Sequence, residues 1–419
     1  MVEKNSLIKI LYSIYTGEYP NEFTGGPNNI IYKIIANSKV NNYHFDYLSK
    51  DLFAKNLTKK NIDTIIDKRT PKKKITSYFA ENSKLYRKIF GSDFYLPYHF
   101  YKNEKYFKSF QNKVKDNHIL HSQDSVSLAL LDNAKTKNVK KIFTVHSKGP
   151  LSDEFKSMAK NKTLQNNINK RMIGYEKRSI KLADIITFPS YAAKEYFEES
   201  LSVKLNMDKV RIIYNGIEFA KIQNIKNENI LDKYSVKKNN QLLLLNIAAH
   251  GREKNIDILL RTVEKIINKY KRNVSLINIG IGSDTKDLVS LTKELDVEKH
   301  VKFLGKIPNN DVIRLLKATD IFIMTSEKVI FDLVVLEALA SGACCIVSNE
   351  GGNKEIITDG ENGFLIDIKD IDAIAKKIIS ILPHKDIVRE NAVKTAKQFS
   401  VQKMVNEYFN VYESLLNDV

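Results

Sequence analysis

The sequence predicts an α/β protein built from two doubly wound parallel-sheet domains. At 419 residues the chain is too long for one compact core. Short apolar runs recur along it, and such runs are typical of strands that are buried on both faces. A helical segment follows nearly every run, which is the order expected of parallel sheets. We expect domains at 1–224 and 225–400, followed by a terminal helix at 401–419 that could pack back on the first domain.

The first domain is predicted to open with a strand at 8–15. A loop at 16–27 follows, and its Gly25 and Gly26 allow a sharp turn or the close approach of a ligand. Residues 43–53 are ambiguous. The remaining strands are predicted at 119–123, 141–146, 184–188 and 210–214, and the helices at 28–36, 124–134, 151–183 and 189–201. The polar stretch 219–239 is expected to connect the domains.

The second domain repeats this alternation. Strands are predicted at 241–248, 274–280, 301–304, 320–324 and 343–348, and helices at 256–270, 285–295, 309–318 and 333–340, with helical segments to the end of the chain. The apolar helix 333–340 carries one carboxylate, Glu337. Its N-terminus should lie at the carboxyl edge of a parallel sheet, where free N–H groups favour anions. A ribose diol bound there would give Glu337 a polar partner, although an ordinary strand–helix unit would look the same.

The positive charge is confined to one half of the chain. Of the net charge of +18, residues 1–224 contribute 39 Lys and Arg against 22 Asp and Glu, whereas residues 225–419 contain 28 against 27. Such a field favours an anionic partner for the first half: membrane phospholipid, a lipid-phosphate acceptor or nucleic acid. The alternative, that lysine serves only solubility, does not explain why one half alone is basic.

A basic and aromatic segment at 59–110 concentrates this charge. It contains the cluster Lys68, Arg69, Lys72, Lys73 and Lys74, followed by twelve Tyr and Phe residues between 78 and 110. Lysine interleaved with aromatic residues suits an interfacial membrane contact, and it suits single-stranded nucleic acid equally well. An insertion whose aromatic residues pack on the core is the third interpretation.

Several classes of protein are not favoured. No apolar run approaches the roughly 18 residues of a membrane span, and the N-terminus reads as a strand rather than a signal peptide. Cys344 and Cys345 are adjacent in a predicted core strand, so neither a disulfide framework nor a zinc site is indicated. We therefore expect a cytoplasmic protein, and its basic first half allows a location at the inner face of the cell membrane.

Several motifs now occur in a particular order. Gly-Gly follows the first strand, His146 ends another strand, and Glu176 precedes Ala183-Asp184. Then come NGIE at 215–218, REKN at 252–255, IGIG at 279–282 and the block 325–363, which ends in IITDGENGF. In this order the chain resembles the retaining GT-B glycosyltransferases of family 4. The resemblance implies two Rossmann-like domains that face a cleft, with the nucleotide sugar, UDP-sugar foremost, held by the C-terminal domain and the acceptor by the N-terminal one.

The resemblance also implies roles for particular residues. Glu337 would accept hydrogen bonds from the ribose hydroxyls, and the N–H groups of Leu333 and Val334 would face the diphosphate. Lys254 would neutralise the diphosphate as a point charge. The loop at Gly25 and Gly26 would close over it. His146 would lie near the transferred sugar or the acceptor, unless it is only a polar strand-end residue.

Three positions depart from the family pattern. The first Glu of the family's E-x₇-E motif is replaced by Val329, although Glu327 could swing in. The usual glycine before the phosphate-binding helix is Asp332, a good N-cap whose charge would oppose a diphosphate. The family arginine is Ala249, and His250 or Arg252 could compensate. Either the active site is re-tuned or the protein is catalytically silent.

The sequence as a whole predicts a glycosyltransferase, associated peripherally with the membrane, that uses an envelope-glycan or lipid-linked acceptor. No metal or other cofactor is expected, because no Asp-x-Asp motif lies at the end of a predicted strand and no His/Cys cluster is present. One alternative is a catalytically silent GT-B protein that serves as partner or scaffold of an active glycosyltransferase. A nucleic-acid-binding protein is less favoured, because no motif for that function occurs.

Overall fold

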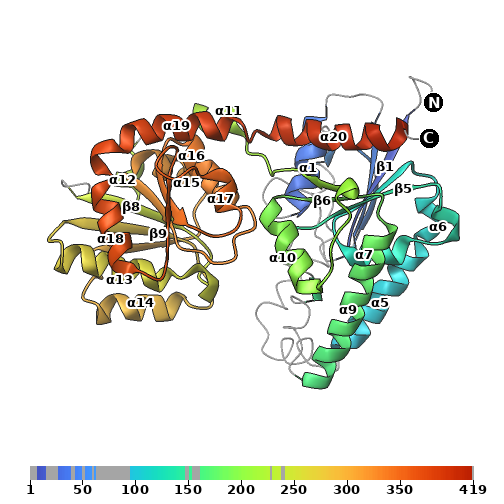
Figure 1. Ribbon diagram of the computed structural model, residues 1–419, viewed down its shortest axis with the longest axis horizontal. Coiled ribbons are helices and arrows are strands. Elements are labelled where there is room, and N and C mark those ends of the chain that lie inside the picture. The colour runs from blue at the N-terminus through green and yellow to red at the C-terminus, as the bar shows by residue number, and fades with distance from the viewer. Residues whose placement is uncertain are drawn as a thin grey trace. The chain divides into compact units, whose positions relative to one another are not determined.

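Two compact units make up the chain, and each is built around one β-sheet (Figure 1). The computed structural model describes residues 7–15, 27–38, 43–49, 52–58, 61–62, 95–146, 151–152, 161–226, 229–236 and 241–417. Unit 1 comprises Met1–Tyr214 with Met404–Val419, and unit 2 comprises Asn215–Lys403. Unit 2 begins earlier than 225 because Ile217 already pairs with Ser400.

The sheet of unit 1 has seven strands in the described part of the chain, in the order β3-β2-β1-β4-β5-β6-β7. All neighbours are parallel except β2 and β3. The predicted doubly wound sheet is confirmed, with two strands added in and after the ambiguous stretch 43–53: β2 and the antiparallel edge strand β3. The strands are β1 (Ile8–Ile14), β2 (Tyr43–Ser49), β3 (Leu52–Leu57), β4 (Ile119–Ser122), β5 (Lys140–Thr144), β6 (Ile185–Phe188) and β7 (Val210–Ile212).

The predicted helices of unit 1 occur in the expected order, α7 being shorter than expected, and α5 and α6 were not predicted. α7 ends at Leu131 because Asp132 leaves the helical conformation and Asn133 caps a separate 3-10 turn at Ala134–Thr136. None of the helices that the structure describes is long and apolar enough to span a bilayer. The helices are α1 (Pro27–Asn37), α5 (Tyr95–Ser109), α6 (Gln111–Val114), α7 (Ser125–Leu131), α9 (Lys162–Leu182), α10 (Tyr191–Leu201) and the terminal α20 (Val401–Asn417).

Unit 2 contains a six-stranded sheet in the order β10-β9-β8-β11-β12-β13, parallel throughout. Its strands are β8 (Leu242–Ile247), β9 (Val274–Ile279), β10 (Val301–Gly305), β11 (Ile321–Met324), β12 (Cys344–Ser348) and β13 (Phe364–Ile366). β13 was not predicted, because three residues are too few for a periodic signal. β11 and β12 are buried over their whole length, as the predicted apolar runs require.

Helices cover both faces of the unit 2 sheet. In Figure 1, α13 and α14 lie on one side of it and α15 and α16 on the other. The stretch 219–239, expected to be an irregular connection, contains two short helices whose Ile222 and Ile230 are buried. The helices are α11 (Phe219–Asn224), α12 (Ile230–Lys233), α13 (Ile256–Asn268), α14 (Thr285–Glu294), α15 (Asn309–Ala318), α16 (Leu333–Ala340), α17 (Asn353–Ile356), α18 (Ile371–Ser380) and α19 (Lys385–Lys397).

The strand order determines where ligands can bind. In unit 1 the direction of winding reverses between β1 and β4, and in unit 2 it reverses between β8 and β11. The loops that leave neighbouring strands at such a point diverge to opposite faces, which opens a crevice at the carboxyl edge of the sheet. Each unit therefore presents one crevice of this kind.

Helix α20 is held on the sheet of unit 1 by buried polar contacts. The Tyr412 hydroxyl lies 2.8 Å from the Tyr12 hydroxyl and 2.9 Å from His121 Nδ1. The other nitrogen of His121, Nε2, lies 2.7 Å from Thr144 Oγ1. His121 is fully buried, and burial lowers its pKa to about 3. The imidazole is therefore neutral at physiological pH.

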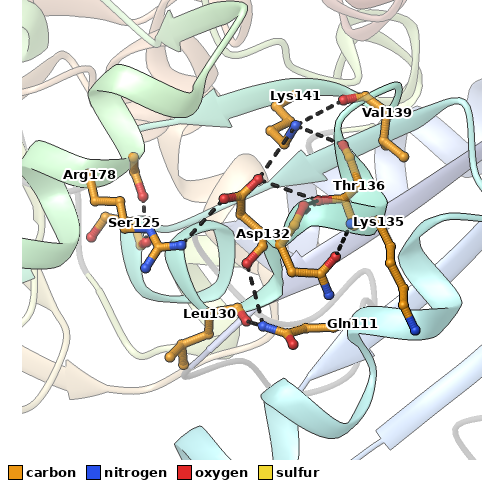
Figure 2. Close-up of polar contacts among 11 residues, drawn as sticks. Gln111, Ser125, Leu130, Asp132, Lys135, Thr136, Val139, Lys141 and Arg178 are labelled. Atoms are coloured by element: carbon orange, nitrogen blue, oxygen red, sulfur yellow. Dashed lines mark hydrogen bonds and ion pairs between the residues drawn. The ribbon is translucent and has the colours of Figure 1, made fainter.

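A polar cluster around Asp132 fixes the turn after α7 (Figure 2). It lies at the amino end of β5, away from the carboxyl edge of the sheet where the crevice opens. Its carboxylate oxygens lie 3.6 Å from Lys141 Nζ and 3.3 Å from Arg178 Nη2. Lys141 Nζ also donates to two backbone carbonyl oxygens, of Thr136 and Val139. The position and the internal pairing of the cluster indicate a purely structural role.

Replacing Asp132 tests this role. Asp132→Ala should lower the free energy of unfolding by about 3 kcal/mol, because it leaves the buried Lys141 ammonium without its counter-ion. Lys135→Ala is the matched control: its exposed contact with Asn112 should contribute less than about 0.5 kcal/mol. Urea titration measures both values, and equal losses in the two variants would contradict the structural role.

Candidate functional site

The crevice of unit 2 begins with the loop that leaves β8. Two glycines bring this loop against the one that follows β9: a Cβ on Gly280 would lie 1.8 Å from Ala248 O, and one on Gly282 would lie 2.2 Å from His250 O. The IGIG motif is therefore required by backbone packing. Beyond it, the 3-10 turn Arg252–Lys254 and the left-handed Asn255 (φ 49°) lead into α13.

His250 is a structural residue of this loop. It is buried, with Nε2 2.6 Å from Asn278 Oδ1 and Nδ1 2.8 Å from Thr285 Oγ1. Because both ring nitrogens are occupied, the prediction that His250 could replace the missing arginine at position 249 is wrong. Arg252 is exposed at the same loop and stays the candidate for that charge.

The loop after β11 is attached to the Arg252–Lys254 turn. Thr325 Oγ1 donates to Lys254 O at 2.9 Å, Asn255 Nδ2 donates to Thr325 O at 3.2 Å, and the Glu327 N–H donates to Glu253 O at 2.9 Å. Two candidate residues 73 positions apart in the chain, Lys254 and Glu327, thus belong to one loop cluster. The Glu327 side chain is exposed, and Lys254 is partly exposed.

Val329 faces inward in this loop. Its side chain is 1% exposed, and its carbonyl accepts the Gly352 N–H at 2.9 Å. A Cβ on Gly352 would lie 1.9 Å from Ile330 O, so only glycine fits there. The position that carries the family's first Glu is therefore used here for packing.

Helix α16 begins at the end of this loop. Among the described residues no protein acceptor takes the N–H groups of Leu333 and Val334, as is usual for first-turn amides without a cap. Glu337 lies one turn further on. Asp332 occupies the N-cap position, but its side chain makes no capping hydrogen bond, and its buried Oδ2 has no protein partner in the described part of the chain. The expectation that Asp332 caps α16 through its side chain is thus wrong.

The crevice of unit 1 contains His146. Its Nε2 lies 2.6 Å from Gln123 Oε1, and burial lowers the pKa of His146 to about 4. Asp124, which follows Gln123 in the chain, caps α7 by accepting the Ser127 N–H at 2.8 Å. It also accepts the Tyr15 N–H at 2.5 Å. Burial raises the pKa of Asp124 to about 6.

A cavity of about 170 Å³ opens beside His146. Gln123, Ser125, Thr144 and Glu176 contribute polar groups to its wall. Gln123 and Ser125 were not among the site residues predicted from the sequence. The signal that could have found them is the run His-Ser-Gln-Asp-Ser at 121–125, in which polar residues stand between a buried strand and a helix start.

Some predicted site residues lie outside the described residues: Gly25, Gly26, Lys68, Arg69, Lys72, Lys73 and Lys74. In the residues that are described, no group of three or more His, Cys, Asp and Glu side chains could hold a metal ion. The two crevices thus provide a cationic turn and a helix N-terminus in unit 2, and in unit 1 a polar cavity whose described lining contains no Lys or Arg.

Two family models match the chain, and together they span most of it. Residues 227–399 match the model described as glycosyl transferases group 1, and residues 53–221 match the one described as glycosyltransferase family 4.

Curated relatives and solved structures are similar as well. The chain is 28% identical over 243 residues to N-acetyl-alpha-D-glucosaminyl L-malate synthase of Bacillus anthracis, covering 57% of this chain and 62% of that protein. It is 27% identical to an Escherichia coli UDP-Gal:alpha-D-GlcNAc-diphosphoundecaprenol alpha-1,3-galactosyltransferase, over 49% of this chain and 54% of that one. The matches thus span less than two thirds of these relatives.

Among solved structures, a glycosyltransferase from Rickettsia africae superimposes with a TM-score of 0.70 at 18% identity, covering 98% of this chain and 99% of that one. Anabaena HepE in complex with UDP superimposes with a TM-score of 0.66 at 16% identity, covering 97% and 100%. The fold, the ordered motifs and the two family models agree. The chain belongs to the family 4 glycosyltransferases of the GT-B fold.

Proposed function

We propose that the protein transfers a sugar from a nucleoside-diphosphate sugar, most favourably a UDP-sugar, to an envelope-glycan or lipid-linked acceptor with retention of configuration. The observation that carries this proposal is the loop cluster of unit 2. Hydrogen bonds hold the Lys254 turn against the loop that leads into α16, whose N–H groups and Glu337 follow at the same edge of the sheet. A cation, free amides and a carboxylate suit a diphosphate and a ribose diol.

The chemistry needs little more from unit 2. As the bond between the sugar C1 and the β-phosphate oxygen breaks, charge develops on the leaving diphosphate, and Lys254 with the α16 amides would stabilise it. The acceptor oxygen forms the new bond to C1 and gives up its proton to the oxygen of the leaving diphosphate. Arg252 could add charge at the same turn. No metal ion is required in this scheme.

The choice of a UDP-sugar is supported by similar proteins. The structure of HepE was solved in complex with UDP-glucose. The structure of a pneumococcal O-GlcNAc transferase, GtfA, was solved in complex with UDP and GlcNAc. The proposed acceptor class is supported by the charge of residues 1–224 and by the lipid diphosphate in the name of the E. coli relative. The cluster at Lys68–Lys74 is the proposed contact with a membrane surface, which would place the protein at the inner face of the cell membrane.

A catalytically silent scaffold is the second candidate. Buried Val329 cannot hydrogen-bond a sugar hydroxyl, and the Asp332 carboxylate stands beside the amides that a diphosphate would use. Such a protein would bind no nucleotide sugar.

Calorimetry with UDP, UDP-glucose, UDP-galactose and UDP-N-acetylglucosamine, followed by assays of sugar release and transfer, separates the two candidates. We expect binding by the wild type, with Lys254→Ala weakening it about 10- to 100-fold, because a charge-assisted contact is lost. Glu337→Gln should weaken it about tenfold. Lys293→Ala, an exposed lysine on α14, is the control and should change nothing. Binding of any of the four ligands would rule out the silent scaffold, and if the wild type binds none of them, the proposed use of a UDP-sugar is wrong.

A further inference from the structure

The cavity in the crevice of unit 1 has an unusual lining for a protein with so basic an N-terminal half. Its described walls contain no Lys or Arg; they present Gln123, Ser125, Thr144 and His146 together with the carboxyl groups of Asp124 and Glu176. Such a wall attracts no phosphate or carboxylate, since nothing in it balances a negative charge. The polar groups that it offers suit a neutral ligand.

Gln123 and Ser125 each carry a buried polar atom in this wall without a hydrogen-bond partner among the described residues. Gln123 is 3% exposed and Ser125 is 1% exposed. Among the described residues no protein atom forms a hydrogen bond with Gln123 Nε2 or with Ser125 Oγ. A buried donor without an acceptor destabilises a fold, so native proteins seldom keep one unless a ligand or ordered water satisfies it.

The other end of the Gln123 amide is occupied. Its Oε1 lies 2.6 Å from His146 Nε2, and an amide oxygen can only accept, so the proton of the neutral imidazole lies on Nε2. Nδ1 is then an acceptor. Burial keeps the pKa of His146 far below 7, so this tautomer stays uncharged at physiological pH. Gln123 Nε2 can donate a hydrogen bond, Ser125 Oγ can donate or accept one, and His146 Nδ1 can accept one. A hydroxyl group, which both donates and accepts hydrogen bonds, would complement this set.

We propose that this cavity binds a hydroxyl group of a saccharide substrate, that Gln123 and Ser125 contact it directly, and that Gln123 also holds His146 in the Nε2–H tautomer. The proposal rests on the glycosyltransferase function for the nature of the substrate. Donor sugar and acceptor saccharide both carry hydroxyl groups, and the experiment below distinguishes them.

The first test observes His146 without any reaction. Full-length protein labelled with ¹⁵N-histidine is titrated with D-glucose, D-galactose or N-acetylglucosamine, and the His146 resonances are assigned with His146→Gln. We expect the Nε2–H tautomer in the free protein and a shift on addition of at least one sugar. Gln123→Met should alter the tautomer and abolish the shift, and Ser125→Ala should abolish the shift alone. Gln111→Met is the matched control, because Gln111 Nε2 donates to Leu130 O in the structural cluster at the other end of the sheet (Figure 2).

Thermal stability separates a ligand contact from a packing role. Because Ser125 Oγ has no partner in the described protein, Ser125→Ala should leave the melting temperature unchanged or raise it, while substrate handling falls. A residue that merely supports the fold would show the reverse.

The second test uses UDP-glucose and UDP-N-acetylglucosamine and compares donor hydrolysis with transfer to an acceptor. Gln123→Met and Ser125→Ala should lower kcat/KM about tenfold and leave UDP affinity unchanged. Loss in hydrolysis and transfer alike assigns the cavity to the donor sugar, and loss in transfer alone assigns it to the acceptor. The proposal is overturned if no monosaccharide shifts His146, or if both variants match Gln111→Met. Failure of the wild type to bind UDP would instead refute the proposed function. The monosaccharide titration would still decide whether the cavity binds a saccharide hydroxyl.

Discussion

Acidification from pH 7 to pH 4 should lower the unfolding free energy of unit 1 by about 4 kcal/mol. Burial depresses the pKa of His121 to about 3 and that of His146 to about 4, against an ordinary value of 6.5. Below pH 6.5 the unfolded chain therefore binds a proton at each histidine that the folded chain does not. The unfolding free energy therefore decreases as the pH falls, until the pH reaches the pKa values of the folded state. At pH 4 the two histidines together lower it by about 6 kcal/mol.

Asp124 opposes this loss in part. Burial raises its folded pKa to about 6 from 3.8, so the folded protein takes up this proton before the unfolded chain does. Protonation of Asp124 between pH 7 and pH 4 therefore restores about 2 kcal/mol. The net loss of about 4 kcal/mol is the difference between these two contributions.

Urea titrations at pH 7 and pH 4 measure the loss, and hydrogen exchange of peptides from β4 and β5 assigns the transition to unit 1. The double variant His121→Gln/His146→Gln should be nearly insensitive to acid over this range, or slightly stabilised by it through Asp124. His300→Gln in unit 2, whose Nδ1 lies 2.9 Å from a backbone oxygen of β9, is the control and should follow the wild type. An unchanged acid response in the double variant would show that other groups cause the loss.

Removing the charge of Asp332 should strengthen the binding of UDP-sugars by about 100-fold. Asp332 precedes the α16 amides without capping them, so its carboxylate would lie near a diphosphate bound at Leu333 and Val334. Like charges about 5 Å apart repel by about 3 kcal/mol at an effective dielectric constant of 20, which corresponds to about two orders of magnitude in affinity. Asp332→Asn keeps a good N-cap residue and removes the charge.

Calorimetry with UDP-glucose at two salt concentrations measures this effect, and the gain should shrink at high salt. Asp284→Asn is the control, because Asp284 is the N-cap of α14 and likewise makes no capping hydrogen bond. Weaker binding by Asp332→Asn would mean that the carboxylate contacts the ligand, for example through a sugar hydroxyl. The placement of the diphosphate at α16 would then be wrong.

The sequence predicted the fold well where burial leaves a periodic signal. Apolar runs such as 321–324 and 344–348 are buried throughout, so their strands were found within a residue or two. It failed where the signal is short or mixed: β13 spans three residues, and residues 219–239 are mostly polar although Ile222 and Ile230 are buried. Periodicity reports which faces are buried, and it needs several turns or strand residues to do so.

The candidate site was predicted less completely. Lys254 and α16 could be selected because a charged turn and a helix start follow predicted strands. The hydrogen-bond partners of individual polar side chains could not be predicted, because these partners lie far away along the chain. Both ring nitrogens of His250 form hydrogen bonds, one with Asn278 and one with Thr285. Gln123 and His146, which follow two neighbouring strands, form a hydrogen bond with each other. No local pattern contains either contact.

The sequence by itself determined two parallel α/β units, the family and a basic N-terminal half, because these follow from hydrophobic patterning, ordered motifs and composition. Tertiary structure alone decided the chemistry of single residues. It joined Lys254 to the loop of Glu327, turned Val329 inward, left Asp332 without a capping bond, and set a neutral His146 beside the unsatisfied Gln123 amide. Burial and hydrogen bonding between distant segments fix protonation and partners, and neither can be read from the order of residues.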